Sequence, residues 1–194
     1  MKYKFTINQL EKKGYAVCKV ENFKIFEALQ DSFIKNINFS TSKKKTIEDV
    51  RKYFAKMNKA EINCVDISES YPLTIQTKIG IKPICISHCD SIAVAVLGLN
   101  YDSIGVDIES NDRIISTGIL DQFCSTKEIK ELMYASPKER LEIWMIKEAV
   151  SKAIGDGMSI AKEVEIVGDN AYYQTSIFRV IRHEYKGHNI VIAI

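Results

Sequence analysis

Apolar and polar positions follow two different periods in the first half of the chain. Residues 15–20, YAVCKV, alternate between apolar and polar side chains, which predicts a strand. Residues 22–37 and 42–57 instead repeat their apolar side chains at helical spacing, which predicts two helices, the second with Ser42 as its N-cap. Short apolar runs bounded by polar turns then predict strands, at residues 84–89, 92–99 and 104–109.

The second half begins with two helix start signals. Residues 125–128 are STKE and residues 136–139 are SPKE, and both are capping-box patterns, the second with proline at the first helical position. Gly155 lies where a glycine is expected to end the long helix that follows SPKE.

Strands are predicted again after the long helix. Residues 164–194 favour three or four of them, with turns near residues 168–170 and 186–188. This order of elements predicts an α+β fold, with two halves of similar size that meet near residue 100.

Composition and charge exclude several classes of protein. Of the 194 residues, 46% are hydrophobic, which is enough for a sizeable core. Basic residues number 27 and acidic residues 25, and this net charge of +2 is too small a bias to indicate nucleic-acid binding. No apolar run is long enough to span a membrane, and MKYKFTINQL at the start has no signal-type apolar region. The five cysteines include no CxxC pair or zinc spacing, so we expect reduced thiols in a cytoplasmic protein.

The long helix has two faces of different character. One is continuously apolar, and the opposite face carries Trp144, Lys147, Glu148, Ser151 and Lys152. The simplest interpretation is a surface ion pair between Glu148 and Lys152, worth about 0.3–0.5 kcal/mol. A tryptophan in the middle of this face weakens that interpretation and favours a ligand-binding surface.

Two carboxylates share one side of the strand predicted at residues 104–109. Asp107 and Glu109 are two positions apart, so their Cα atoms are expected about 7 Å from each other on the same face. One interpretation is the polar side of an edge strand. The other is a site for a hard divalent cation such as Mg²⁺, which would offset the repulsion between the two carboxylates.

Ser87 and His88 end another predicted strand and allow three interpretations. His88 and Cys89 resemble a base and a nucleophile, but neighbouring residues of a strand point to opposite faces, which argues against a thiol hydrolase. A partly buried histidine with its hydrogen bonds satisfied is the ordinary alternative. The third interpretation is a hydroxyl and an imidazole that hold a phosphate group.

The order of four motifs resembles the 4′-phosphopantetheinyl transferase superfamily. The motifs are SHC, GVDIE, FCSTKE and WMIKEAVSKAIGDG, and the resemblance covers about residues 80–160. The last motif has every position of the family pattern WxxKEAxxKxxGxG, whereas FCSTKE has one extra residue, Cys124. Chain length and motif spacing resemble the surfactin-type branch of the family.

The resemblance implies a fold of two similar α+β subdomains related by a pseudo-twofold axis. The expected boundaries are residues 1–100 and 101–194, with the active site at the junction. A chain with two such halves is expected to act as a monomer. The implied activity is transfer of 4′-phosphopantetheine from coenzyme A to a serine of an apo acyl- or peptidyl-carrier protein, with release of adenosine 3′,5′-bisphosphate.

The resemblance also implies roles for particular residues. Mg²⁺, or Mn²⁺ in its place, would be held by Asp107, Glu109 and Glu148, and the residues assigned to catalysis are Asp107, Glu148 and Lys152. Glu148 is a ligand, a general base or both. Trp144 would wall the site against water.

Coenzyme A would contact a second set of residues. These are Lys82, Ser87, His88, Lys147 and Lys152, of which the two helix lysines would bind phosphate oxygens. The alternative functions are a Mg²⁺-dependent phosphohydrolase of coenzyme A or nucleotides, and a relative that binds coenzyme A or a carrier protein without catalysis. Ser125 and Glu128 are interpreted chiefly as a helix cap.

Overall fold

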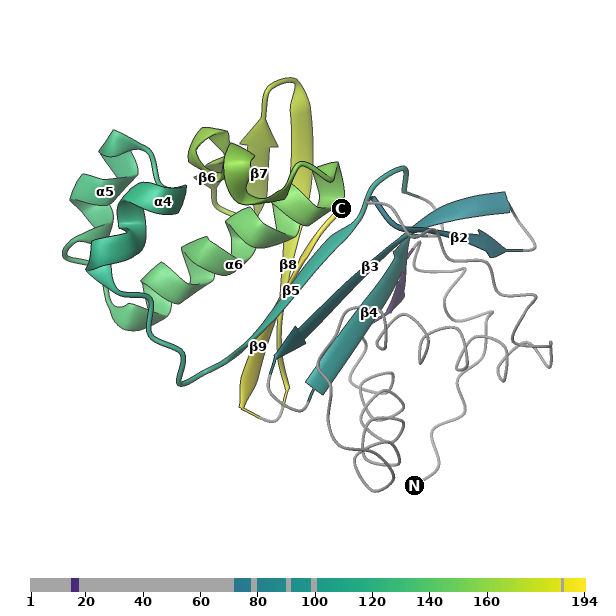
Figure 1. The fold of residues 1–194 in the computed structure, drawn as a ribbon, viewed down its shortest axis with the longest axis horizontal. Helices are drawn as coiled ribbons and strands as arrows, with labels where there is room; N and C mark the ends of the chain where they lie inside the picture. Colours follow the sequence, from purple (N-terminus) through teal and green to yellow (C-terminus); the bar gives the residue numbers. More distant parts are fainter. Residues whose placement is uncertain (1–14, 18–71, 78–79, 90–91, 99–100, 186) are drawn as a thin grey trace. The chain divides into compact units, whose positions relative to one another are not determined.

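The chain divides into two compact units, residues 1–103 and 104–194, and each contains an antiparallel sheet of its own. Figure 1 shows the computed structural model of the protein. The helices predicted at residues 22–37 and 42–57 lie outside the residues that the structure describes. The described residues are 15–17, 72–77, 80–89, 92–98, 101–185 and 187–194.

The described strands of the first unit form one sheet in the order β1-β4-β3-β2. They confirm the strands predicted from the sequence in this unit, and β3 begins four residues earlier than the predicted position 84. Three consecutive residues of β3, Ile84, Cys85 and Ile86, are buried. The four strands are β1 (Tyr15–Val17), β2 (Thr74–Thr77), β3 (Gly80–Cys89) and β4 (Ile92–Gly98).

The sheet of the second unit has the order β5-β9-β8-β7-β6, with every neighbouring pair antiparallel. The four strands after residue 164 confirm the prediction for the end of the chain. Gly168 and Gly187 lie in the turns between them and have positive φ, which glycine adopts without strain. The strands are β5 (Gly105–Ser110), β6 (Glu165–Val167), β7 (Asn170–Tyr173), β8 (Ser176–Tyr185) and β9 (His188–Ala193).

Both predicted capping boxes are present in the second unit. The Ser125 and Ser136 side chains accept hydrogen bonds from the backbone N–H groups of Glu128 and Glu139, whose carboxylates bind back to the serine N–H groups. Gly155 ends the long helix in the left-handed conformation, with φ of 97°. The short helices η2, α4 and η3 were not predicted. The helices are η2 (Thr117–Ile119), α4 (Leu120–Phe123), α5 (Thr126–Leu132), α6 (Pro137–Ile154) and η3 (Gly157–Glu163).

Helix α6 packs across the sheet of the second unit, over β5 and β9 (Figure 1). Its apolar residues form one buried cluster with the side chains of Val191 and Ala193 from β9. In the antiparallel register Val191 lies opposite Asp107 and Ala193 lies opposite Gly105, so these two β5 residues face α6 as well. The α6 residues of the cluster are Leu141, Met145, Ile146, Ala149, Val150 and Ala153.

Gly105 sets the distance between β5 and α6. A Cβ atom at this position would lie 2.8 Å from the Ala149 carbonyl carbon and from Ala153 N, and closer still to the Ala149 oxygen. Gly105→Ala should therefore lower the free energy of unfolding by about 1–3 kcal/mol, because the helix must move away. Urea denaturation followed by circular dichroism measures the loss. Gly118→Ala is the control, since its Cβ would meet Ser116 Oγ at 3.5 Å, and equal stabilities would contradict the prediction.

Candidate metal and phosphate site

Asp107 and Glu109 lie on the face of β5 that α6 covers. Asp107 is 1% exposed and Glu109 is 7% exposed. β5 is an edge strand among the described strands, but the interpretation of these residues as its solvated polar side is wrong. Burial of two carboxylates on one strand is costly without compensating charge, so the charges around them decide what the site does.

Helix α6 brings a third carboxylate and one cation to the same place. Oxygen atoms of Asp107, Glu109 and Glu148 all lie within 4.8 Å of one another. The Lys152 ammonium donates to Asp107 Oδ1 at 2.9 Å and lies 3.0 Å from Glu148 Oε1. The predicted ion pair between Glu148 and Lys152 therefore exists, but it is half-buried and shared with the strand. The structure brings together all three carboxylates that the sequence singled out.

Burial raises the pKa of Asp107 to about 6. The Lys152 ammonium opposes this effect, whereas the negative charges of Glu148 and Glu109 add to it. A carboxyl group in this environment is costly to ionise, and a bound divalent cation would favour its ionised form. The three carboxylates offer only oxygen atoms, which is the donor set that Mg²⁺ and Mn²⁺ prefer.

The raised pKa of Asp107 predicts a pH-dependent stability in the absence of metal. The folded protein holds the Asp107 proton more tightly than the unfolded chain does. The stabilisation that protonated Asp107 gives to the folded state is therefore fully present below pH 3.8 and is lost as the pH rises to about 6. One pKa unit corresponds to about 1.4 kcal/mol, so wild type should lose about 2 kcal/mol relative to Asp107→Asn between pH 4 and pH 7. Urea denaturation of both proteins in EDTA measures this difference. A stability difference independent of pH would contradict the prediction.

Arg113 is a residue of the site that sequence reasoning missed. Its guanidinium forms an ion pair with Glu109 and lies 5.3 Å from the centre of the Trp144 ring. The edge of this ring meets Phe123 with the centroids 4.9 Å apart. Trp144 is half-buried and is connected to the carboxylates through Arg113, while the wall against water that the resemblance implies stays a prediction. The sequence feature that could have predicted this ion pair is the position of Arg113, a basic residue four positions after Glu109.

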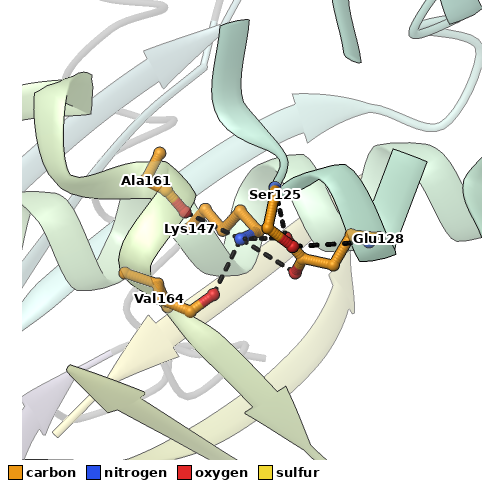
Figure 2. A network of polar contacts seen from close by, with 5 residues as sticks. All are labelled: Ser125, Glu128, Lys147, Ala161 and Val164. Carbon is orange, nitrogen blue, oxygen red and sulfur yellow. Dashed lines mark hydrogen bonds and ion pairs between the residues drawn. The ribbon is translucent and has the colours of Figure 1, made fainter. Parts of the chain in front are cut away.

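Lys147 is not on an exposed face of α6, and the prediction that it is was wrong. Its side chain is fully buried, and Nζ donates to the carbonyl oxygens of Ala161 and Val164, each at 2.7 Å. The third partner is Glu128, whose Oε1 lies 2.9 Å away (Figure 2). In this arrangement Lys147 has no surface with which to contact phosphate oxygens. Ser151, assigned to the same polar face, is buried too.

The residues predicted to bind coenzyme A outside α6 lie on β3 of the first unit. Ser87 is buried and His88 is exposed, so the interpretation of His88 as a partly buried histidine was wrong. As neighbours in one strand they point to opposite faces, and β3 does not bring this pair together. Lys82 is half-buried on the same strand.

Three of the five cysteines lie among the described residues. Cys85, Cys89 and Cys124 are in the reduced thiol form, and burial raises the pKa of Cys124 to about 11. Cys18 and Cys64 lie outside the described residues. None of the helices described is both long and apolar enough to cross a membrane.

Comparison with known families adds one match. Residues 103–188 match the 4′-phosphopantetheinyl transferase superfamily. The matched segment contains all three carboxylates, together with Arg113 and Lys152. It begins after β3, so it does not include the predicted coenzyme A residues of the first unit. No curated protein gives a significant match to the chain.

The α+β elements of the second unit, with an antiparallel sheet and a long helix, fit a domain of the matched superfamily. Two of the motifs that carry the resemblance, GVDIE and WMIKEAVSKAIGDG, lie on β5 and around α6 within the matched segment. The match and the geometry therefore point to the same part of the chain.

Proposed function

We propose that the protein transfers 4′-phosphopantetheine from coenzyme A to a serine hydroxyl of an apo acyl- or peptidyl-carrier protein. The serine oxygen would attack the phosphorus atom that carries the pantetheine arm, and adenosine 3′,5′-bisphosphate would leave with the oxygen of the broken phosphoanhydride bond. One observation carries the proposal: three carboxylates, two of them buried, and a lysine converge inside the segment that matches the phosphopantetheinyl transferase superfamily.

Asp107, Glu109 and Glu148 would hold Mg²⁺, or Mn²⁺ in its place. The bound cation would neutralise charge on the pyrophosphate and help to align the reacting groups. The gathering of three oxygen ligands with a raised pKa at Asp107 supports this assignment. Histidine and cysteine are absent from this ligand set, which agrees with a hard cation.

The remaining residues of the site would act on the substrate or its proton. Lys152, now held between Asp107 and Glu148, would move onto phosphate oxygens and stabilise the leaving bisphosphate. Glu148 would accept the serine proton, directly or through water, in addition to its role as ligand. Trp144 would exclude water beside the reacting phosphate.

Further proposals rest on the resemblance of the sequence. Lys82, Ser87 and His88 would contact the nucleotide and the 3′-phosphate of coenzyme A. The protein would belong to the surfactin-type branch, with two similar subdomains related by a pseudo-twofold axis, and would act as a cytoplasmic monomer. Lys147 is not proposed as a phosphate contact, because its side chain is fully buried.

Intact-protein mass spectrometry tests the proposed transfer. Apo acyl- and peptidyl-carrier proteins incubated with the protein, coenzyme A and Mg²⁺ should each gain the mass of one phosphopantetheine, and EDTA should abolish the gain. Relative rates would rank the carrier proteins as partners. Hydrolysis of coenzyme A without any gain on a carrier would replace the proposal with a phosphohydrolase. Binding of coenzyme A without either reaction would indicate a non-catalytic relative.

A further inference from the structure

Lys147 joins three segments of the second unit at a single atom. Lys147 lies in the middle of α6, Glu128 in the first turn of α5, and Ala161 and Val164 at the end of η3 (Figure 2). An ammonium group has three protons, and here it meets one carboxylate and two carbonyl oxygens. Its hydrogen bonds are therefore fully used within the protein.

Glu128 belongs to the same network and has a second partner besides Lys147. Its Oε2 accepts the Ser125 backbone N–H at 2.8 Å, which completes the capping box of α5. The carboxylate thus fixes the start of α5 and compensates the buried charge of Lys147 at once. Hydrogen bonds between a buried cation and a carboxylate are short and directional, so this contact restricts the position of α6.

Glu148 follows Lys147 directly in the chain and points to a different side of α6. The contact of Gly105 with Ala149 fixes the distance of α6 from β5. The Lys147 hydrogen bonds reach α6 from α5 and η3, so they oppose a rotation of the helix about its own axis. A rotation of about 10° would move a carboxylate lying about 6 Å from the axis by about 1 Å, and in enzymes a displacement of this size can cost about 10²-fold in rate.

We propose that Lys147 and Glu128 are positioning residues for the carboxylate site, which they serve by setting the rotation of α6 that aims Glu148 and Lys152 at Asp107. This inference rests on the proposed metal site of the transferase. The inference assigns Lys147 a role without contact to the substrate, although Lys147 is adjacent in sequence to Glu148 of the site. Partners that hold metal ligands in place typically contribute about 10–100-fold to metal affinity.

Binding of Mn²⁺ alone tests the inference, measured on the full chain by the electron paramagnetic resonance signal of the free ion. Glu128→Gln keeps the shape and an oxygen acceptor for the Ser125 N–H, but loses the charge that holds Lys147. Its affinity for Mn²⁺ should fall about 10-fold or more. Lys147→Met/Glu128→Gln avoids an unpaired buried charge, and should also bind Mn²⁺ about 10-fold or more weakly while remaining folded.

Arg182→Met is the matched control. Arg182 ties α6 to β8 through an ion pair with Glu142, but this pair is largely exposed and includes none of the three carboxylates. Its affinity for Mn²⁺ should stay within about twofold of wild type. Wild-type affinity in both network variants would overturn the inference and leave Lys147 with a role in stability alone. Wild-type protein that binds no Mn²⁺ would overturn the metal site and this inference together.

Measuring the affinity for Mn²⁺ allows the inference and the proposed function to be tested independently. Wild type that binds Mn²⁺ but modifies no carrier protein would refute the transferase, whereas the affinities of the network variants would still decide the role of Lys147. Wild type that transfers phosphopantetheine, with network variants that bind Mn²⁺ normally, would refute the inference alone.

Discussion

Glu148→Gln should lower the rate of phosphopantetheine transfer by about 10²–10³-fold while the protein remains folded. The substitution keeps the size of the side chain but removes one of the three charges that would hold the cation. Loss of a metal-binding charge weakens the stabilisation of the transition state by several kcal/mol, and each 1.36 kcal/mol corresponds to about tenfold in rate. Initial rates on an apo carrier protein at saturating coenzyme A and Mg²⁺ measure the effect.

Glu142→Gln supplies the control for this experiment. Glu142 belongs to the same helix and also takes part in an ion pair, but its partner is Arg182 and not a residue of the site. Its transfer rate should stay within about twofold of wild type, since an exposed ion pair contributes little. Turnover of Glu148→Gln at the wild-type rate would refute the assignment of Glu148 as a ligand.

Lys147→Met should lower the free energy of unfolding by about 3–5 kcal/mol. Methionine fills most of the space of the lysine stem, but it leaves the Glu128 carboxylate and two carbonyl oxygens without their cation. Breaking a largely buried ion pair from one side is costly because the partly buried carboxylate and the two carbonyl oxygens lose their shared cation. Urea denaturation at pH 7, in EDTA so that metal binding does not contribute, measures the loss.

Two variants show whether the cost comes from the buried charge. Lys147→Met/Glu128→Gln should recover part of the stability lost in Lys147→Met, because no uncompensated carboxylate remains. Arg182→Met removes a half-exposed cation from the same unit and should cost about 1 kcal/mol or less. A Lys147→Met protein as stable as Arg182→Met would contradict the burial of this ammonium group.

The sequence predicted well those features that depend on residues close together in the chain. The capping boxes at Ser125 and Ser136 and the glycine stop at Gly155 are local patterns, and all three were found. The shared face of Asp107 and Glu109 follows from the two-residue period of a strand. The meeting of these residues with Glu148 was reached only through the resemblance to a family, because periodicity does not show which strand a helix covers.

Features that depend on three-dimensional packing were not predictable. A helical projection separates α6 into two faces, but α5 and η3 cover a third direction and bury Lys147. Glu128 was interpreted chiefly as a cap, since no local pattern indicates a partner 19 residues away in the chain. Arg113 lies in a loop without periodicity, and its contacts with Glu109 and Trp144 require the fold.

The double use of Glu128 narrows the choice of amino acid at this position. An ordinary capping box accepts glutamate or glutamine, because it needs only an oxygen that reaches the N-cap backbone. Here the same carboxylate must also be negatively charged, because it compensates the charge of the buried Lys147 ammonium group. Glutamine supplies the oxygen without the charge, and aspartate supplies the charge on a stem one methylene shorter. The start of a seven-residue helix therefore tolerates less sequence variation than its exposed location on the surface of the unit suggests.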